Sequence, residues 1–119
     1  MLSLQEIERI ILVELKNIIR ASKITRNKLR FTFSDQSFVE IFKSDNITNR
    51  WAFHWERKHV DGMIYRHDNV PHKSWEKIES FPWHYHYKSE GNVIKSEFSN
   101  DIMQNVRKLI KFAKEIFDI

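Results

Sequence analysis

The apolar positions at the start of the chain predict a helix. Ser3-Leu4-Gln5-Glu6 has the composition of a capping box, in which the Ser3 hydroxyl and the Glu6 carboxylate each accept a backbone N–H that the first helical turn leaves unpaired. Apolar residues then recur at spacings of three and four, the period of one helical face. They are Leu4, Ile7, Ile11, Leu15 and Ile18, widened by Ile10 and Ile19. We expect this helix to run to about Ala21, with the apolar stripe in the core.

From Lys28 the apolar period changes to two, which is typical of strands. Leu29, Phe31 and Phe33 alternate with polar residues, a polar cluster at 34–37 turns the chain, and a second apolar arm runs back to residue 42. This pattern predicts a hairpin. Because the second arm is apolar on both faces, we expect it to be an inner strand that a helix covers on one side.

The next two β-rich arms are separated by Asp61-Gly62, a strong hairpin signal. A two-residue loop would place two arginines opposite each other, which is unfavourable. We therefore favour a three-residue loop with the glycine in the left-handed conformation, which pairs Glu56 with Arg66 and His54 with Asp68.

In this register the two faces of the predicted hairpin differ in chemistry. The apolar face carries Trp51, Phe53, Trp55, Met63 and Tyr65, and the polar face carries His54, Glu56, Lys58, Arg66 and Asp68. A loop is expected over 70–80. Residues 83–88 then alternate again, with aromatic side chains on one side and His84, His86 and Lys88 on the other. If this strand joins the sheet in matching phase, its histidines extend the polar face.

The end of the chain predicts a turn at Glu90-Gly91-Asn92 and a final helix. Ser99 is the expected N-cap. The inward stripe of this helix consists of Ile102, Val106, Leu109, Ile110, Ala113, Ile116 and Phe117. Its outward face is basic, with Arg107, Lys108, Lys111 and Lys114. Such a face is more often solvated than bound to a phosphate backbone.

These elements predict one α+β domain over residues 1–119. It has an antiparallel sheet of about five strands, made of hairpins around 28–43 and 51–69 and a strand around 82–88, flanked by the N-terminal and C-terminal helices. A length of 119 residues, with 41% hydrophobic residues, two glycines and two prolines, suits one ordered domain and leaves no room for a second.

Composition narrows the range of chemistry. The chain has no cysteine, which excludes disulfides and thiolate metal sites. No apolar run approaches the ~20 residues that span a bilayer, and the start is not a signal peptide, so we expect no membrane partner and a cytoplasmic location. The net charge of +4 permits a nucleic-acid partner without demanding one, because 16 acidic residues dilute the basic excess.

The histidines are the strongest candidates for chemistry, since all six lie in one central part of the chain. On a strand, His84 and His86 point to one side, roughly 7 Å apart. A metal site would need a third ligand from His54, Asp68 or His72.

A chemistry without a metal or other cofactor is the preferred interpretation. One neutral and one protonated imidazole can take a proton from a ribose 2′-hydroxyl and give one to the leaving 5′-oxygen, while an arginine balances the phosphorane charge. We assign these roles to His84, His86 and Arg66, with Asp68 holding an imidazole in its tautomer. The predicted substrate-binding residues are Asn69, His72, His54 and Lys88.

Structural explanations compete with this interpretation. Arg66, Asp68 and Glu56 would also form a cross-strand ion-pair ladder, and Asn69 with Pro71 would simply end a strand. Trp75 and Trp83 would stack on unpaired bases or pack in the core. A non-catalytic module that binds protein or nucleic acid, and a His/Asp metal protein, therefore stay open as alternatives.

Residues 65–72 read Tyr-Arg-His-Asp-Asn-Val-Pro-His, and residues 81–86 read Phe-Pro-Trp-His-Tyr-His. These two runs resemble the paired signature of the TumE family of toxins. That signature is Arg-x-Asp-Asn-x-x-His followed by Phe-Pro-His-His-x-His. Trp83 stands where the family usually has a histidine, and Lys73 stands where a second one often follows His72. The matching residues are Arg66, Asp68, Asn69, His72, Phe81, Pro82, His84 and His86.

The resemblance implies a small α+β toxin that is encoded beside a helix-turn-helix antitoxin, its expected partner. It does not supply an activity. RNA as a substrate, and the four catalytic residues, follow from our chemical interpretation of the residues. A homodimer also stays open.

Overall fold

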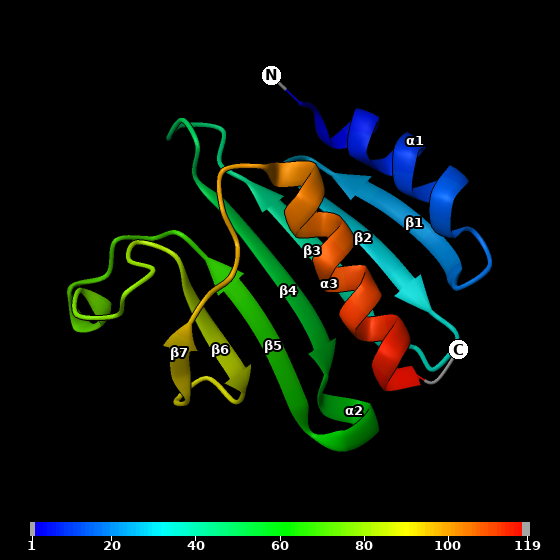
Figure 1. Ribbon diagram of the computed structural model, residues 1–119. Coiled ribbons are helices and arrows are strands. Elements are labelled where there is room, and N and C mark those ends of the chain that lie inside the picture. The colour runs from blue at the N-terminus through cyan, green and yellow to red at the C-terminus, as the bar shows by residue number, and fades with distance from the viewer. Residues whose placement is uncertain (1, 118–119) are drawn as a thin grey trace.

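The computed structural model describes residues 2–117 as one antiparallel sheet with two long helices on one face (Figure 1). The sheet has seven strands that pair in chain order, rather than the five expected. The elements are α1 (Leu4–Leu15), β1 (Ile19–Thr25), β2 (Lys28–Phe33), β3 (Phe38–Lys43), β4 (Trp51–Arg57), α2 (Lys58–Asp61), β5 (Met63–Asp68), the 3-10 helix η1 (Lys73–Trp75), β6 (His84–Lys88), β7 (Val93–Lys95) and α3 (Ile102–Phe117).

Helix α1 begins as the sequence predicts but ends earlier. Both hydrogen bonds of the Ser3–Glu6 capping box are present. The helix stops at Leu15, and Ile19–Thr25 forms the edge strand β1 against β2, so the prediction of a helix to Ala21 was wrong. The helical spacing of apolar residues continued beyond the true end of the helix, because Ile18 is buried in the core although it lies outside α1. β-Branched isoleucines favour a strand that can pair with the edge of β2.

The two predicted hairpins are confirmed as β2–β3 and β4–β5, but the register of the second was wrong. His54 lies opposite Arg66, and Asp68 lies opposite Ala52. The connection is longer than expected, because the helical turn α2 precedes Gly62, which has the predicted left-handed conformation with φ 78°. Lys58, expected on the polar face, is the first residue of α2.

The polar contacts of the buried Arg57 explain this longer connection. The guanidinium of Arg57, at the end of β4, is 2.9 Å from Asp61 Oδ2 and 2.8 Å from Asp35 Oδ2. These bonds hold both the α2 turn and the turn between β2 and β3. The register error is two residues, an even number, so every side chain within β4 and β5 keeps its predicted face.

Strand β7 and the start of α3 differ from expectation. The turn at 90–92 is present, but the chain then returns as β7, whose Val93 lies opposite His86. In α3 the N-cap is Asp101, since its Oδ1 accepts the N–H of Gln104, and Ser99 is not the cap. Ile116, predicted to point inward, is exposed, and the side chain of Phe117 lies outside the described residues.

The core lies between the two long helices and one face of the sheet. Trp55 is fully buried at its centre, stacked on Tyr65 and edge-on to Phe33, and its Nε1–H donates to Ser37 Oγ at 3.0 Å. Trp83 also packs here against Phe53. Of its two predicted roles, stacking on bases and packing in the core, the structure therefore shows the second. The opposite face, which we call the polar face, carries Arg30, Glu40, His54, Glu56, Arg66, Asp68, His84 and His86.

His67 is a buried polar residue on the core face. Its ring is stacked between Tyr85 and Phe98, with both ring centroids 3.7 Å away, and its Nδ1 is 2.7 Å from Ser96 Oγ. Burial lowers the pKa of His67 from 6.5 to about 3, so the folded protein holds this imidazole neutral.

This environment predicts a loss of stability in acid. Because the unfolded chain binds the proton more tightly, the contribution of His67 is complete above pH 6.5 and is lost as pH falls toward 3. Between pH 7 and pH 5 we expect the free energy of unfolding to fall by about 2 kcal/mol from this group alone. Urea unfolding of His67→Phe should show a correspondingly flatter pH dependence of the free energy of unfolding.

The control is His59→Gln, a change at an exposed histidine, which should keep the wild-type dependence of the free energy of unfolding on pH. The same pH dependence in all three proteins would contradict the prediction.

Candidate functional site

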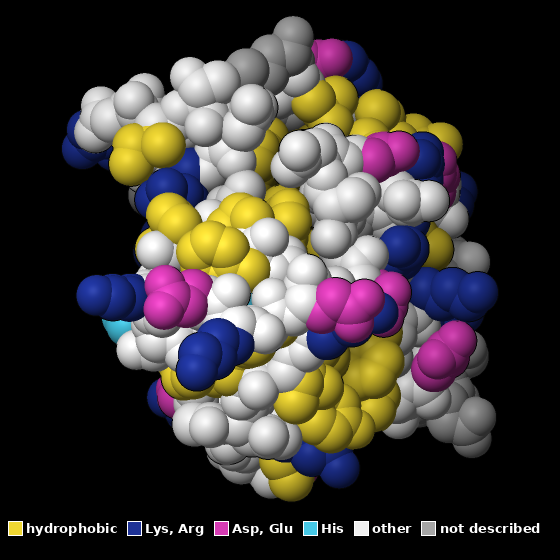
Figure 2. Space-filling model, turned by 60° about the vertical axis from the view of Figure 1, so that its left-hand side comes forward, with side chains coloured by type: hydrophobic (Ala, Val, Ile, Leu, Met, Phe, Trp, Pro, Cys, Tyr) yellow, Lys and Arg dark blue, Asp and Glu magenta, His cyan; other side chains and the backbone are white. Residues whose placement is uncertain are grey.

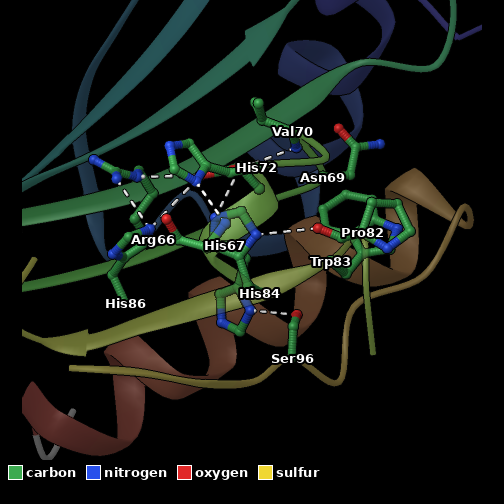
Figure 3. Close-up of polar contacts among 12 residues, drawn as sticks. Arg66, His67, Asn69, Val70, His72, Pro82, Trp83, His84, His86 and Ser96 are labelled. Atoms are coloured by element: carbon green, nitrogen blue, oxygen red, sulfur yellow. Dashed lines mark hydrogen bonds and ion pairs between the residues drawn. The ribbon is translucent and has the colours of Figure 1, made fainter. Parts of the chain in front are cut away.

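The pairing of β5 with β6 brings the predicted catalytic residues together. Arg66 lies opposite His86 and Asp68 lies opposite His84, so all four side chains leave the sheet on the polar face. The sequence left open whether β6 joins the sheet in matching phase; it does, and the two histidines lie beside the arginine and the aspartate. We call these four residues the central cluster; Figure 3 shows its polar contacts.

Each imidazole of the central cluster is oriented by a backbone carbonyl. His84 Nδ1 is 3.1 Å from the carbonyl oxygen of Pro82, and His86 Nδ1 is 2.8 Å from that of Glu90. A carbonyl oxygen can only accept, so both Nδ1 atoms carry the proton. The Nε2 atom is consequently the reactive nitrogen of both rings.

Both Nε2 atoms point toward the carboxylate of Asp68. His84 Nε2 is 3.1 Å from Asp68 Oδ1, and His86 Nε2 is 3.9 Å from Oδ2. The N–H of Val70 donates to Oδ1 at 3.1 Å and fixes the rotation of the carboxylate. The site therefore gathers two imidazole nitrogens and one carboxylate at a single point.

Arg66 supplies the positive charge of the cluster. Its Nε is 3.3 Å from Asp68 Oδ2, and its Nη2 is 3.1 Å from His86 Nε2. Glu90 holds the outer side of the guanidinium, at 2.9 Å from Nη1 and 2.8 Å from Nη2. Burial lowers the pKa of His86, and the Arg66 charge acts in the same direction. His86 is thus a neutral hydrogen-bond acceptor.

The cluster is shielded from solvent. Asp68, His84 and His86 are each exposed by 6% or less, whereas the Arg66 side chain is 29% exposed. Trp75, in η1, lies over the histidines, with its ring centroid 6.2 Å from that of His84 and 6.3 Å from that of His86. Arg66 is therefore the cluster residue most open to solvent, and Trp75 lies over the two imidazoles.

The predicted substrate-binding residues lie in different places. His54 is opposite Arg66 on the polar face, and its Nε2 is 3.4 Å from Glu56 Oε1. His72 is exposed beside Trp75 and caps η1 through Nδ1. Lys88 has φ 70°, and its ammonium lies 5.2 Å from the centroid of the Tyr87 ring, so it does not join the histidines.

Asn69 has a structural task. Its Oδ1 accepts the N–H of Trp51 at 3.0 Å, and its Nδ2 donates to the carbonyl oxygen of Asn49 at 2.6 Å. The residue is 8% exposed. These bonds tie the end of β5 to the start of β4 and so support the strand that carries Asp68.

Sequence reasoning missed Glu90 and the shielding role of Trp75. Glu90 was assigned only to a turn, yet its carboxylate holds Arg66 and its carbonyl oxygen orients His86. Its position four residues after His86, just beyond the strand, was the available signal. Glu56 does not complete an ion-pair ladder with Arg66, because its carboxylate contacts His54 and accepts the N–H of Lys58.

Comparison with known proteins identifies the family. The model of the family described as Toxin TumE matches residues 7–117, nearly the whole chain. The protein therefore belongs to the TumE toxin family, and a toxin of this kind implies an antitoxin partner. No curated protein and no solved structure matched significantly. Within residues 2–117, the helices are too short or too polar to cross a bilayer.

The contacts of Asn69 predict a loss of stability when it is truncated. Asn69→Ala leaves the Trp51 N–H unpaired in a buried position, which should lower the free energy of unfolding by about 2 kcal/mol. Urea unfolding measures this, with the exposed Asn100→Ala as the control, expected within about 0.5 kcal/mol of wild type. An Asn69→Ala protein of wild-type stability that binds RNA poorly would instead make Asn69 a substrate contact.

The position of Trp75 predicts that it limits access to the histidines. Trp75→Ala should speed the modification of His84 and His86 by diethyl pyrocarbonate, followed site by site by mass spectrometry. His67, buried behind the sheet, should react at its wild-type rate and serves as the internal control. Unchanged rates at both cluster histidines would show that Trp75 does not shield them.

Proposed function

We propose that this toxin acts on RNA and that the central cluster is its active site. The observation that carries the proposal is the meeting of two imidazole Nε2 atoms, one carboxylate and one guanidinium at a single point. A phosphodiester reaction needs a base, an acid and a positive charge near the phosphate, and this group of side chains can supply all three.

In the metal-free protein the chemistry follows from the proton positions. A neutral imidazole with its proton on Nδ1 carries a lone pair on Nε2. Once Arg66 turns toward the phosphate, this lone pair of His86 can accept the proton of a ribose 2′-hydroxyl. His86 fits this role because burial and Arg66 keep it neutral. His84 fits the role of the acid, since its Nε2 lies 3.1 Å from Asp68 Oδ1, which can accept a hydrogen bond from that nitrogen.

Arg66 is the residue that would meet the phosphate first. It is the most exposed member of the cluster and borders a shallow hollow of the polar face. That hollow is lined by Lys28, Glu40, Phe42, Ala52, His54 and Arg66. We propose that the RNA backbone crosses this hollow past His54 and that an unpaired base reaches Trp75 and His72.

The surface drawn in Figure 2 and the outer side of α3 carry mixed charge, so we do not place the substrate on either of them. On the face drawn in Figure 2, basic and acidic side chains are interspersed and little histidine is visible. The basic side of α3 is likewise divided, because Arg107 is paired with Glu14 at 2.8 Å. The proposed substrate surface leaves out Asn69 and Lys88, whose side chains are engaged elsewhere.

The proposal includes control by an antitoxin in the cytoplasm. We propose that a helix-turn-helix protein encoded beside the toxin gene neutralises it by covering the polar face near Arg66. The non-catalytic alternative, an RNA-binding toxin that does not cleave, uses the same surface and differs only in turnover.

The proposal predicts that the cluster histidines are needed for toxicity. His84→Gln and His86→Gln should each abolish growth arrest in cells and cleavage of RNA by purified protein, because glutamine cannot exchange protons near neutral pH. Activity should fall by about 100-fold or more, the usual contribution of a general acid or base. The measurements are growth after induced expression and the mapping of new RNA ends.

The matched control is His59→Gln, which removes an exposed histidine on α2 and should stay fully toxic. Circular dichroism and urea unfolding show whether each variant is folded. A folded His84→Gln protein that still cleaves RNA would exclude the proposed site, and wild-type protein that binds RNA without cutting it would favour the binding module.

A further inference from the structure

We propose that Asp68, His84 and His86 bind a divalent transition-metal ion. One potential ligand atom from each residue lies within 4.8 Å of the other two. All three residues are buried and leave the sheet from adjacent positions of β5 and β6. Two imidazoles and one carboxylate form a common ligand set for such ions, with further positions left for water or substrate.

The spacing of the ligand atoms fits a metal ion. In a tetrahedral site with bonds near 2.1 Å, neighbouring ligand atoms are about 3.4 Å apart. The distance from His84 Nε2 to Asp68 Oδ1 is 3.1 Å, and that from His86 Nε2 to Asp68 Oδ2 is 3.9 Å. Small rotations of the side chains would therefore bring all three atoms into a common coordination sphere.

The surroundings of the two histidines are those of metal ligands. A histidine that binds a metal usually donates its other ring N–H to a carbonyl or carboxylate, which fixes the tautomer and the ring plane. His84 does so to Pro82 and His86 to Glu90. The Nε2 lone pair of each histidine is thus directed at the proposed ion position without rearrangement of the backbone.

The close approach of His84 to Asp68 needs a cation. With the proton on Nδ1, the lone pair of His84 Nε2 faces the negative oxygen of Asp68 at 3.1 Å, which is repulsive unless a positive charge lies between them. A proton or a metal ion can supply that charge. The second imidazole directed at the same carboxylate is what favours the metal ion.

Arg66 competes with the metal for this position. Its Nη2 is 3.1 Å from His86 Nε2, the lone pair that the ion would use. The guanidinium is also held from outside by Glu90, so it can turn toward that carboxylate and leave the cluster. Removal of this positive charge should therefore strengthen metal binding, whereas removal of a ligand should abolish it.

The ligand chemistry limits the choice of ion. Imidazole nitrogens suit Zn²⁺, Co²⁺, Ni²⁺ and Fe²⁺, whereas Mg²⁺ and Ca²⁺ prefer sites made only of oxygen ligands. Binding itself does not depend on the proposed function. The effect of metal binding on activity does rest on the proposed function, because with an ion bound the histidines act as ligands rather than as acid and base.

The test is titration of untagged, chelator-treated protein with Zn²⁺ by calorimetry and with Co²⁺ by visible absorption, which reports coordination geometry. Wild-type protein should bind one ion, with a rise in melting temperature. Asp68→Asn, His84→Gln and His86→Gln should each weaken binding by about 100-fold or more. Arg66→Gln should strengthen it by about tenfold, because it removes the neighbouring positive charge.

His54→Gln and His72→Gln, which remove histidines outside the ligand set, are the matched controls and should bind like wild type. The proposal is overturned if wild-type protein binds no ion, or if Asp68→Asn binds as tightly as wild type. Loss of toxicity in His84→Gln together with the absence of metal binding would refute the metal site and leave the active site standing. Tight metal binding by wild type together with full toxicity of His84→Gln would support the metal site and refute the proposed active site.

Discussion

The carboxylate of Asp68 is the group on which the central cluster depends. It is buried, and buried carboxylates are costly unless their charge is balanced and their oxygens are hydrogen-bonded. The backbone N–H of Val70 and the guanidinium of Arg66 provide part of that compensation, and a cation between His84 and Asp68 would provide the rest. Val70, Arg66 and His84 are each placed by the pairing of β5 with β6 and by the segment that follows β5, so the arrangement of the sheet and the electrostatics of the cluster support each other.

Structure and chemistry are divided between the two faces of one strand. Tyr65 and His67 point from β5 into the core, where His67 is held neutral between two aromatic rings, while Arg66 and Asp68 point from the same strand to the polar face. Asn69 then fixes the end of β5 to β4. The site therefore lies on a rigid strand whose other face is anchored in the core, which suits a cluster that must keep short distances between charged groups.

The sequence predicted local features well and long-range ones less well. The capping box follows from the three-residue spacing of Ser3 and Glu6. The central hairpins and the common face of the cluster residues follow from the period of two along the strands and from the turn residues between them. The strand at 19–25 was missed because its isoleucines fit the apolar pattern of a helix as well as that of a strand. Pairing with the edge of β2, a long-range contact, selects the strand. The role of Glu90 depends on where a turn places its carboxylate, which no local pattern encodes.

Every strand of this sheet pairs with its neighbour in the chain, so the sheet contains no crossover. The residues of the central cluster and the groups that orient them all lie between Arg66 and Glu90. Contacts between residues close in sequence require little loop-closure entropy before they form, which favours fast folding. A newly made or newly released copy of the chain can thus assemble its cluster from one short stretch of polypeptide, without waiting for the two ends of the chain to meet.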